Sequence, residues 1–216
     1  MHAEKKIPTK RTVLPKGLYG ITSRDFGMTH VQSARVLLGG GAKLIQYREK
    51  KAGTGAMIEE AREIGLLCKA ENAIFIVNDS VEVAMAVGAD GVHVGHEDVP
   101  VKEARRSLPN KIIGASAASA EEAVRAERDG ADYIGAAAIF HSLRSKPDAR
   151  VIGLEELKRI RDSVKIPVYA IGGIRMEHLK TLKQYGIDGF TVISTILASE
   201  DPEAVAKEFI NGWLRA

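Results

Sequence analysis

Three polar side chains of different chemistry stand at alternate positions near residue 46. Residues 44–50 read LIQYREK, so the segment begins apolar and ends charged. As a β-strand it would project Gln46, Arg48 and Lys50 to the same side, because side chains alternate between the two faces of a strand. An amide, a guanidinium and an ammonium group in a row suit an anion such as a phosphate. The alternative is a strand that simply runs into a solvated loop, since most charged side chains are exposed.

Two aspartates stand at similar places farther along the chain. Asp79 follows the apolar run 74–78, and Asp98 comes shortly after the run 91–94. If these runs are neighbouring strands, both carboxylates could bind one divalent cation. Carboxylates together with substrate phosphate oxygens are the usual setting of Mg²⁺. Asp79 also stands in a context typical of a helix N-cap, and capping alone is the alternative role.

Zinc and thiol chemistry have less support. His93 and His96 are close in sequence, but neither a cysteine nor a third histidine lies near them, which disfavours Zn²⁺. The single cysteine, Cys68, falls within a helical apolar pattern and is expected to be buried packing rather than a nucleophile.

A second group of anion-binding residues is expected near the end of the chain. Gly172 and Gly173 follow the apolar run 168–171, and Ser194 follows the run 189–193. Glycines let the backbone approach a ligand closely, and backbone N–H groups can bind an anion. Barrel enzymes often bind phosphate after their seventh and eighth strands. Cations at the first site and neutral donors at the second fit a reaction between a diphosphate and a monophosphate.

Eight βα units are predicted to position these groups. The expected strands are 18–22, 44–48, 74–78, 91–94, 112–116, 133–136, 168–171 and 189–193. The helical patterns that follow them are 29–38, 56–69, 81–87, 101–107, 120–129, 154–164, 176–185 and 202–214. A Gly-x-Asp punctuation recurs at 88–90, 130–132 and 186–188, each time between a helix and a strand, where glycine suits a left-handed C-cap.

This alternation favours an α/β fold of a single domain, a (β/α)8 TIM barrel over residues 17–216. The alternative is an open doubly wound sheet. It would need fewer strands and usually a G-x-G-x-x-G first turn, which residues 22–27 lack. Residues 1–16 are predicted to form a basic N-terminal arm.

Composition excludes several other classes. The chain has 216 residues, a net charge of +3 and 45% hydrophobic residues, which is typical of one soluble domain. The mild charge does not favour nucleic acid, and the apolar runs are too short for a membrane span. One cysteine and the lack of an apolar signal region predict a cytoplasmic protein. The sequence leaves the oligomeric state open, and a homo-oligomer is compatible with it.

Several motifs together resemble the thiamine-phosphate synthase family, in the family's order from about Leu18 onwards. They are QYREK at 46–50, ND at 78–79, DGVHVGHED at 90–98, GAS at 114–116, KPD at 146–148 and IGGI at 171–174. The resemblance implies a TIM-barrel transferase of thiamine biosynthesis with Mg²⁺ as cofactor. Such an enzyme couples hydroxymethylpyrimidine diphosphate with thiazole phosphate, through a pyrimidine cation, and gives thiamine phosphate and diphosphate.

The resemblance also implies roles for individual residues. Those expected at the diphosphate substrate are Gln46, Arg48, Lys50, Asn78, Ser116 and Lys146. Those expected at the thiazole phosphate are Ser145, Gly173, Ile193 and Ser194. The catalytic set would be Arg48, Lys50, Ser116 and Lys146, and Asp79 and Asp98 would bind Mg²⁺. Catalysis would rest on stabilising the leaving group and on positioning.

The sequence departs from the family pattern in three places. His96 stands where the family usually has glutamine, and Ala118 replaces a common histidine. The loop 136–146 differs most, with Ala137 and Ala138 in place of Gly-Pro. Two alternatives therefore remain open, a thiazole tautomerase-like enzyme and a non-catalytic regulatory barrel that binds thiamine precursors. Asp98 and the missing histidine at position 118 favour the synthase.

Overall fold

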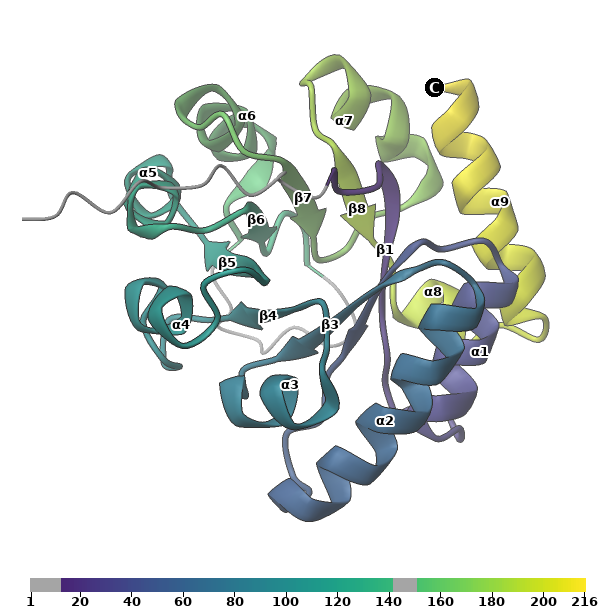
Figure 1. Ribbon diagram of the computed structural model, residues 1–216. Coiled ribbons are helices and arrows are strands. Elements are labelled where there is room, and N and C mark those ends of the chain that lie inside the picture. Colours follow the sequence, from purple (N-terminus) through teal and green to yellow (C-terminus); the bar gives the residue numbers. More distant parts are fainter. Residues whose placement is uncertain (1–12, 142–150) are drawn as a thin grey trace, which may run out of the picture.

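The protein is a closed barrel of eight parallel strands in sequential order, β1 to β8 (Figure 1). The computed structural model describes residues 13–141 and 151–216. The strands are β1 Gly17–Ile21, β2 Leu44–Tyr47, β3 Ile74–Asn78, β4 Gly91–Val94, β5 Ile112–Ala117, β6 Tyr133–Ala137, β7 Val168–Ile171 and β8 Gly189–Thr191. The prediction of a (β/α)8 barrel is confirmed.

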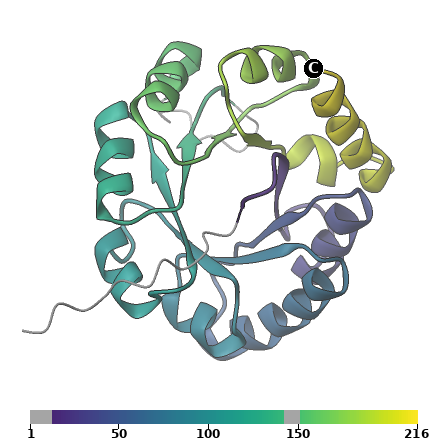
Figure 2. The ribbon, with the colours of Figure 1, turned by 45° about the horizontal axis from the view of Figure 1, so that its top comes forward.

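Helices form a ring around the strands (Figure 2). They are α1 His30–Gly39, α2 Thr54–Ala70, α3 Val81–Val87, α4 Val101–Ser107, α5 Ala120–Asp129, α6 Gly153–Ser163, the 3₁₀ turn η1 Met176–His178, α7 Leu179–Gln184, α8 Ser194–Leu197 and α9 Pro202–Arg215. The last helix, α9, contacts both α1 and β1. This contact completes the ring where the two ends of the barrel sequence meet.

Sequence patterns located most elements to within two residues, and the eighth unit differs most. The run 189–193 was predicted as strand throughout, but β8 ends at Thr191 and the short helix α8 begins at Ser194. Ile193 already has a helical backbone, with φ −107° and ψ −69°. An apolar run of this length does not distinguish a strand from a strand followed by a helical turn.

Apolar side chains inside the barrel close its amino-terminal end. Tyr19, Tyr133 and Tyr169 are fully buried and pack edge to face, with ring centroids 5.4–5.7 Å apart. Leu14 joins this cluster, and the Tyr169 hydroxyl donates to the Pro15 carbonyl at 2.6 Å. The rings need space, since a Cβ at Gly114 would lie 2.1 Å from Tyr133 Cζ. Because these side chains fill the amino-terminal end of the barrel, a ligand cavity is expected at the opposite, carboxyl-terminal end of the strands.

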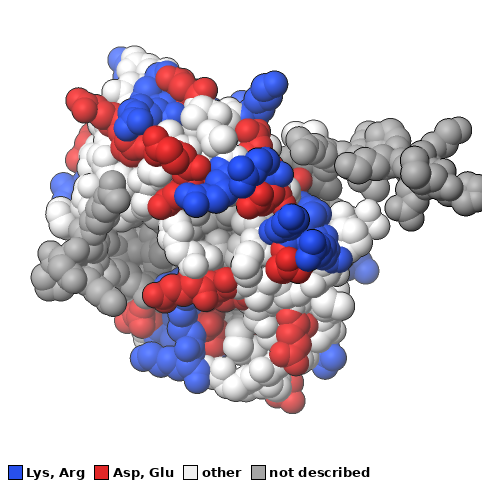
Figure 3. Space-filling model, turned by 90° about the vertical axis from the view of Figure 1, so that its left-hand side faces the viewer, with Lys and Arg blue, Asp and Glu red and all other residues white. Residues whose placement is uncertain are grey.

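Charged side chains of both signs are interspersed on the face of the barrel that carries α5 (Figure 3). Many of them are paired, as Arg159 is with Glu156 at 2.7 Å. No continuous basic surface is visible on the described part of this face. Among residues 13–141 and 151–216, no helix is both long enough and apolar enough to cross a membrane. The expected basic arm, residues 1–16, lies mostly outside the described residues.

Candidate active site

A cavity of about 610 Å³ opens at the carboxyl ends of the strands. It brings together ten predicted site residues, which are Gln46, Arg48, Lys50, Asn78, Asp79, Asp98, Ser116, Gly173, Ile193 and Ser194. They come from β2, β3, β5, the loops after β2, β3, β4, β7 and β8, and the first residue of α8, so the barrel gathers residues up to 148 positions apart in sequence. Ser145 and Lys146 lie outside the described residues.

Alternation along β2 and its continuation directs the first group into the cavity. Gln46 is fully buried, Arg48 is half-buried and Lys50 is exposed, so successive polar groups lie progressively nearer the solvent. Lys50 Nζ lies 2.7 Å from Asp79 Oδ2. The neighbouring strand β3 supplies Asn78, whose buried Nδ2 has no hydrogen-bond partner among the described residues. A buried donor without a partner is costly, and an anionic oxygen from a ligand would satisfy it.

Asp79 and Asp98 meet at the mouth of the cavity. Burial and a hydrogen bond with Asp98 raise the pKa of Asp79. Burial alone would raise the pKa of Asp98, but hydrogen bonds from Asp79 and from the Gly95 N–H, at 2.7 Å, lower it. Two carboxylates this close repel each other when both are ionised. A divalent cation between them would relieve that repulsion, so the pair fits a Mg²⁺ site.

The backbone of Asp79 is also unusual. Its φ of +64° lies in the left-handed region, which non-glycine residues seldom adopt. Aspartate tolerates this conformation better than most residues because its short polar side chain can form local hydrogen bonds. The conformation aims the carboxylate at the cavity instead of at the start of α3, where Ser80 provides the N-cap by accepting from the Val83 N–H. The capping alternative for Asp79 is therefore wrong.

Hydrogen bonds link two cavity residues through the floor of the barrel. Gln46 Nε2 donates to the Tyr19 hydroxyl at 2.7 Å, and this hydroxyl lies 2.6 Å from that of Tyr133. The Tyr133 hydroxyl lies 3.1 Å from His93 Nδ1, and His93 Nε2 lies 3.0 Å from Ser116 Oγ. Burial lowers the pKa of His93 to about 4, so the imidazole is neutral at physiological pH. Gln46 and Ser116 are thus held by one connected set of groups.

The loops after β7 and β8 form the other side of the cavity. Gly172 and Gly173 have φ of +100° and +65°, and a Cβ at Gly173 would lie 2.5 Å from the His141 carbonyl oxygen. Only glycine fits this close approach without a shift of the neighbouring loop. Ile193, which caps α8, and Ser194, its first residue, face the same space.

Sequence reasoning did not select several residues that line the cavity. They are Ile21, His141, Arg175 and Thr191 among the polar and strand-end positions. Arg175 is exposed and directly follows the predicted glycine motif, so its charge was a signal that could have been used. Thr191 is the last residue of β8 and lines the cavity. Strand alternation alone did not single it out, because the predicted strand continued past it to residue 193.

Comparison with known proteins places this chain in a family. Residues 18–196 match the family described as "Thiamine monophosphate synthase". A thiamine-phosphate synthase of Caldivirga maquilingensis is 49% identical over 93% of this chain and 98% of its own. One of Pyrococcus furiosus is 47% identical over 88% and 91%.

Solved structures give the same result. A thiamine phosphate pyrophosphorylase from Pyrococcus furiosus superposes with a TM-score of 0.86 at 45% identity, covering 92% of this chain and 96% of that one. A 3-hexulose-6-phosphate synthase, with a TM-score of 0.67 at 19% identity over 91% and 99% of the two chains, shows the shared fold alone. The chain belongs to the thiamine monophosphate synthase family.

Proposed function

We propose that this protein is a thiamine-phosphate synthase, a transferase that couples hydroxymethylpyrimidine diphosphate with thiazole phosphate. The products are thiamine phosphate and diphosphate. The observation that carries the proposal is the division of one cavity into two parts, a charged part around Arg48, Lys50 and the aspartates and a glycine-rich part around Gly173. Near-complete coverage of relatives that bear this name supports it.

The charged part would bind the diphosphate substrate. The planar guanidinium of Arg48 can form two parallel hydrogen bonds to phosphate oxygens, and Lys50 adds a point charge that follows the phosphate. Asn78 Nδ2 would donate a hydrogen bond to a third phosphate oxygen and so gain the partner that the described residues do not provide. These donors would stabilise the negative charge that grows on the diphosphate as its bond to the pyrimidine carbon breaks.

Asp79 and Asp98 would hold Mg²⁺ beside these donors. The ion, when bound, supplies further neutralisation of the departing diphosphate. The same two carboxylates also contact groups on the rim of the cavity. Asp79 pairs with Lys50, and Asp98 accepts a hydrogen bond from the Gly95 N–H. No side chain in the cavity needs to act as a nucleophile in this reaction.

The pyrimidine would lie over the buried chain of hydrogen bonds, between Gln46 and Ser116. The resemblance to the family implies that the pyrimidine becomes a cation when the diphosphate leaves. A protonated histidine beneath it would repel that cation. His93 instead stays neutral because burial disfavours its charged form.

Gly173, Ile193 and Ser194 would bind the thiazole phosphate. The backbone at Gly173 can approach the phosphate closely, and the Ser194 hydroxyl can donate to it. Ser145 and Lys146 keep their predicted roles at the thiazole phosphate and at the leaving group. The buried, single Cys68 fits a cytoplasmic location for the enzyme.

The test is a direct assay with the purified protein, both substrates and Mg²⁺, in which thiamine phosphate is measured over time. Formation of thiamine phosphate and diphosphate in equal amounts is the expected result. The tautomerase-like alternative predicts no such product but conversion of the thiazole substrate alone. A regulatory barrel predicts binding of both compounds without conversion of either.

A further inference from the structure

Glu49 lies between two cavity residues, yet its side chain points away from the cavity. Its Oε1 accepts hydrogen bonds from three successive backbone N–H groups, those of Lys50 at 2.7 Å, Lys51 at 2.6 Å and Ala52 at 3.3 Å. The segment after β2 is therefore folded around this carboxylate. The side chain of Lys50 projects from this turn into the cavity.

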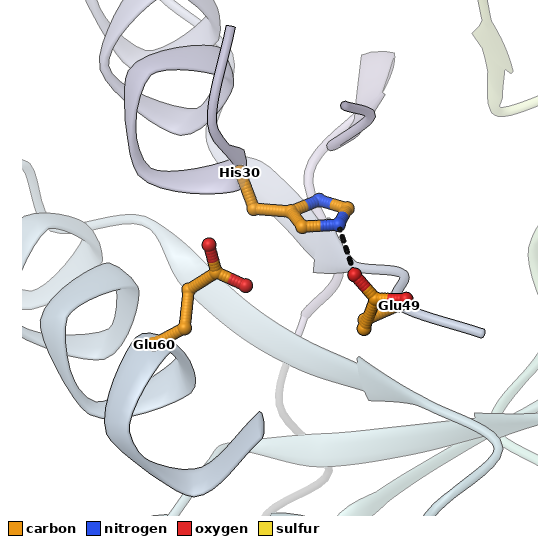
Figure 4. Close-up of side chains that lie close together, drawn as sticks. All are labelled: His30, Glu49 and Glu60. Carbon is orange, nitrogen blue, oxygen red and sulfur yellow. Dashed lines mark hydrogen bonds and ion pairs between the residues drawn. The ribbon is translucent and has the colours of Figure 1, made fainter. Parts of the chain in front are cut away.

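The second oxygen of Glu49 is held by side chains from the loop after β1 and from α1. Oε2 lies 3.2 Å from His30 Nε2 (Figure 4). It also lies 3.2 Å from Arg24 Nε, and the Glu49 side chain is only 8% exposed. Burial by itself would raise the pKa of Glu49. The backbone hydrogen bonds and the one from His30 outweigh burial and lower the pKa to about 2, so the carboxylate is charged and a strong acceptor.

His30 connects this carboxylate back to Arg48. It is 2% exposed, and burial lowers its pKa, which disfavours the charged form of the ring. Nδ1 lies 2.7 Å from Thr22 Oγ1, which in turn accepts from the Arg48 N–H at 3.3 Å. One assignment satisfies every partner, in which Nε2–H donates to Glu49 and the Thr22 hydroxyl donates to Nδ1.

The result is a closed set of hydrogen bonds on the outer side of the loop. It fixes the backbone at Arg48 through Thr22, and at residues 50–52 through Glu49. The side chains of Arg48 and Lys50 project into the cavity from the two fixed positions. Partners behind a binding group commonly matter almost as much as the group itself.

A metal ion is the alternative occupant of this region. The candidate ligands are His30, Glu49 and Glu60, because one ligand atom of each lies within 4.8 Å of the other two (Figure 4). The oxygens already have donors, however. Arg24 also binds Glu60 Oε1 at 2.8 Å, and the Tyr47 hydroxyl donates to Oε2 at 2.9 Å. The Arg24 guanidinium already supplies the positive charge here, so no metal ion is needed. We call the hydrogen-bonded group of Arg24, His30 and Thr22 around Glu49 the clamp.

We propose that Glu49 is a positioning residue of the diphosphate subsite and that His30 orients its carboxylate. The proposal rests on the proposed function in taking a diphosphate as the ligand of Arg48 and Lys50. Without Glu49, the N–H groups of residues 50–52 lose their acceptor, and Lys50 is no longer directed at the cavity.

The experiment compares wild type with Glu49→Ala, Glu49→Gln and the control Glu63→Ala. Glu63 lies on α2 and, within the described part of the chain, forms only an exposed pair with Arg35 at 3.3 Å. Calorimetry would measure the affinity for inorganic pyrophosphate with Mg²⁺ and, separately, for thiazole phosphate. Hydrogen exchange would report the protection of the amides at 50–52.

Glu49→Ala should weaken pyrophosphate binding about tenfold or more and expose these amides to exchange, while thiazole phosphate affinity stays within about twofold of wild type. The pyrophosphate affinity of Glu49→Gln should fall between those of wild type and Glu49→Ala, because its amide oxygen can still accept hydrogen bonds from the backbone N–H groups. It also decides the question if Glu49→Ala does not fold. Glu63→Ala should match wild type in all three measurements.

Unchanged pyrophosphate affinity in both Glu49 variants would overturn the proposal. Equal losses for pyrophosphate and thiazole phosphate would do so as well, since they would indicate general damage. A wild type that binds pyrophosphate but forms no thiamine phosphate would contradict the proposed function and leave the positioning role supported.

Discussion

Lys50 Nζ lies 2.7 Å from Asp79 Oδ2, and this ion pair joins the cationic and acidic parts of the cavity. Asp79 in turn is hydrogen-bonded to Asp98. A diphosphate with its metal ion would give both ends of the pair stronger partners, because the ammonium meets phosphate oxygens and the carboxylate meets the cation. The pair therefore keeps two opposite charges near their expected positions on the rim of the cavity.

Lys50→Ala should lower turnover about 10- to 100-fold and raise the KM for the diphosphate substrate, because a charge on the leaving group loses its partner. The matched control is Lys51→Ala, an exposed lysine one residue away that does not line the cavity. Steady-state kinetics with each substrate varied in turn will separate the two. Equal effects of both substitutions would show that only the general surface charge matters.

Asp98→Asn should raise the Mg²⁺ concentration needed for half-maximal rate about tenfold or more. The amide oxygen can still accept from the Gly95 N–H, so the thermal midpoint should remain near that of wild type. Asp98→Ala should lose this loop contact as well. Glu97→Gln is the control, because it removes an exposed carboxylate next door. Mg²⁺ titrations in which Asp98→Asn matches Glu97→Gln would refute the metal role.

His93 predicts a specific dependence of stability on pH. Its folded pKa of about 4 lies below the value near 6.5 of an unfolded chain, so the unfolded state binds more protons between these values. Stability is therefore retained above about pH 6.5 and falls as the pH drops toward 4, by up to about 3 kcal/mol from this group. Urea unfolding from pH 7 to 4 should show a shallower fall for His93→Gln, and parallel curves would exclude a neutral His93.

Gly173→Ala should raise the KM for thiazole phosphate more than that for the diphosphate substrate. A methyl group there would lie 2.5 Å from the His141 carbonyl oxygen, and it would also sit at φ +65°. The expected loss of stability is about 1–3 kcal/mol. Gly88→Ala, with φ +68° and open space around it, isolates the backbone term. If both variants lose the same stability and keep both KM values, the close approach at Gly173 has no part in binding.

Sequence alone predicted the fold and much of the cavity because the two rest on the same rule. Strand alternation placed Gln46 and Arg48 on one face, and the barrel places the strand ends on one rim, so polar residues at the strand ends had to meet. The relationship of Asp79 to Asp98 followed from the neighbouring strands β3 and β4. The family resemblance then narrowed a general anion site to particular substrates.

Other parts of the site depend on contacts that a sequence does not reveal. The clamp on Glu49 requires α1 to place His30 between Thr22 and that carboxylate, which no local pattern indicates. The same holds for the tyrosines, which are spaced over more than 100 residues and meet only in the closed barrel. The short helix α8 was hidden in an apolar run that also fits a strand.

One cavity is proposed to hold two separate anionic subsites, and paired affinity measurements on Arg48→Ala and Ser194→Ala can distinguish them. Calorimetry with Mg²⁺-pyrophosphate and with thiazole phosphate gives four values. We predict a crossed pattern, in which Arg48→Ala loses about tenfold or more in affinity for pyrophosphate alone and Ser194→Ala loses mainly thiazole phosphate affinity. Losses of similar size for both ligands in both variants would contradict the division of the cavity.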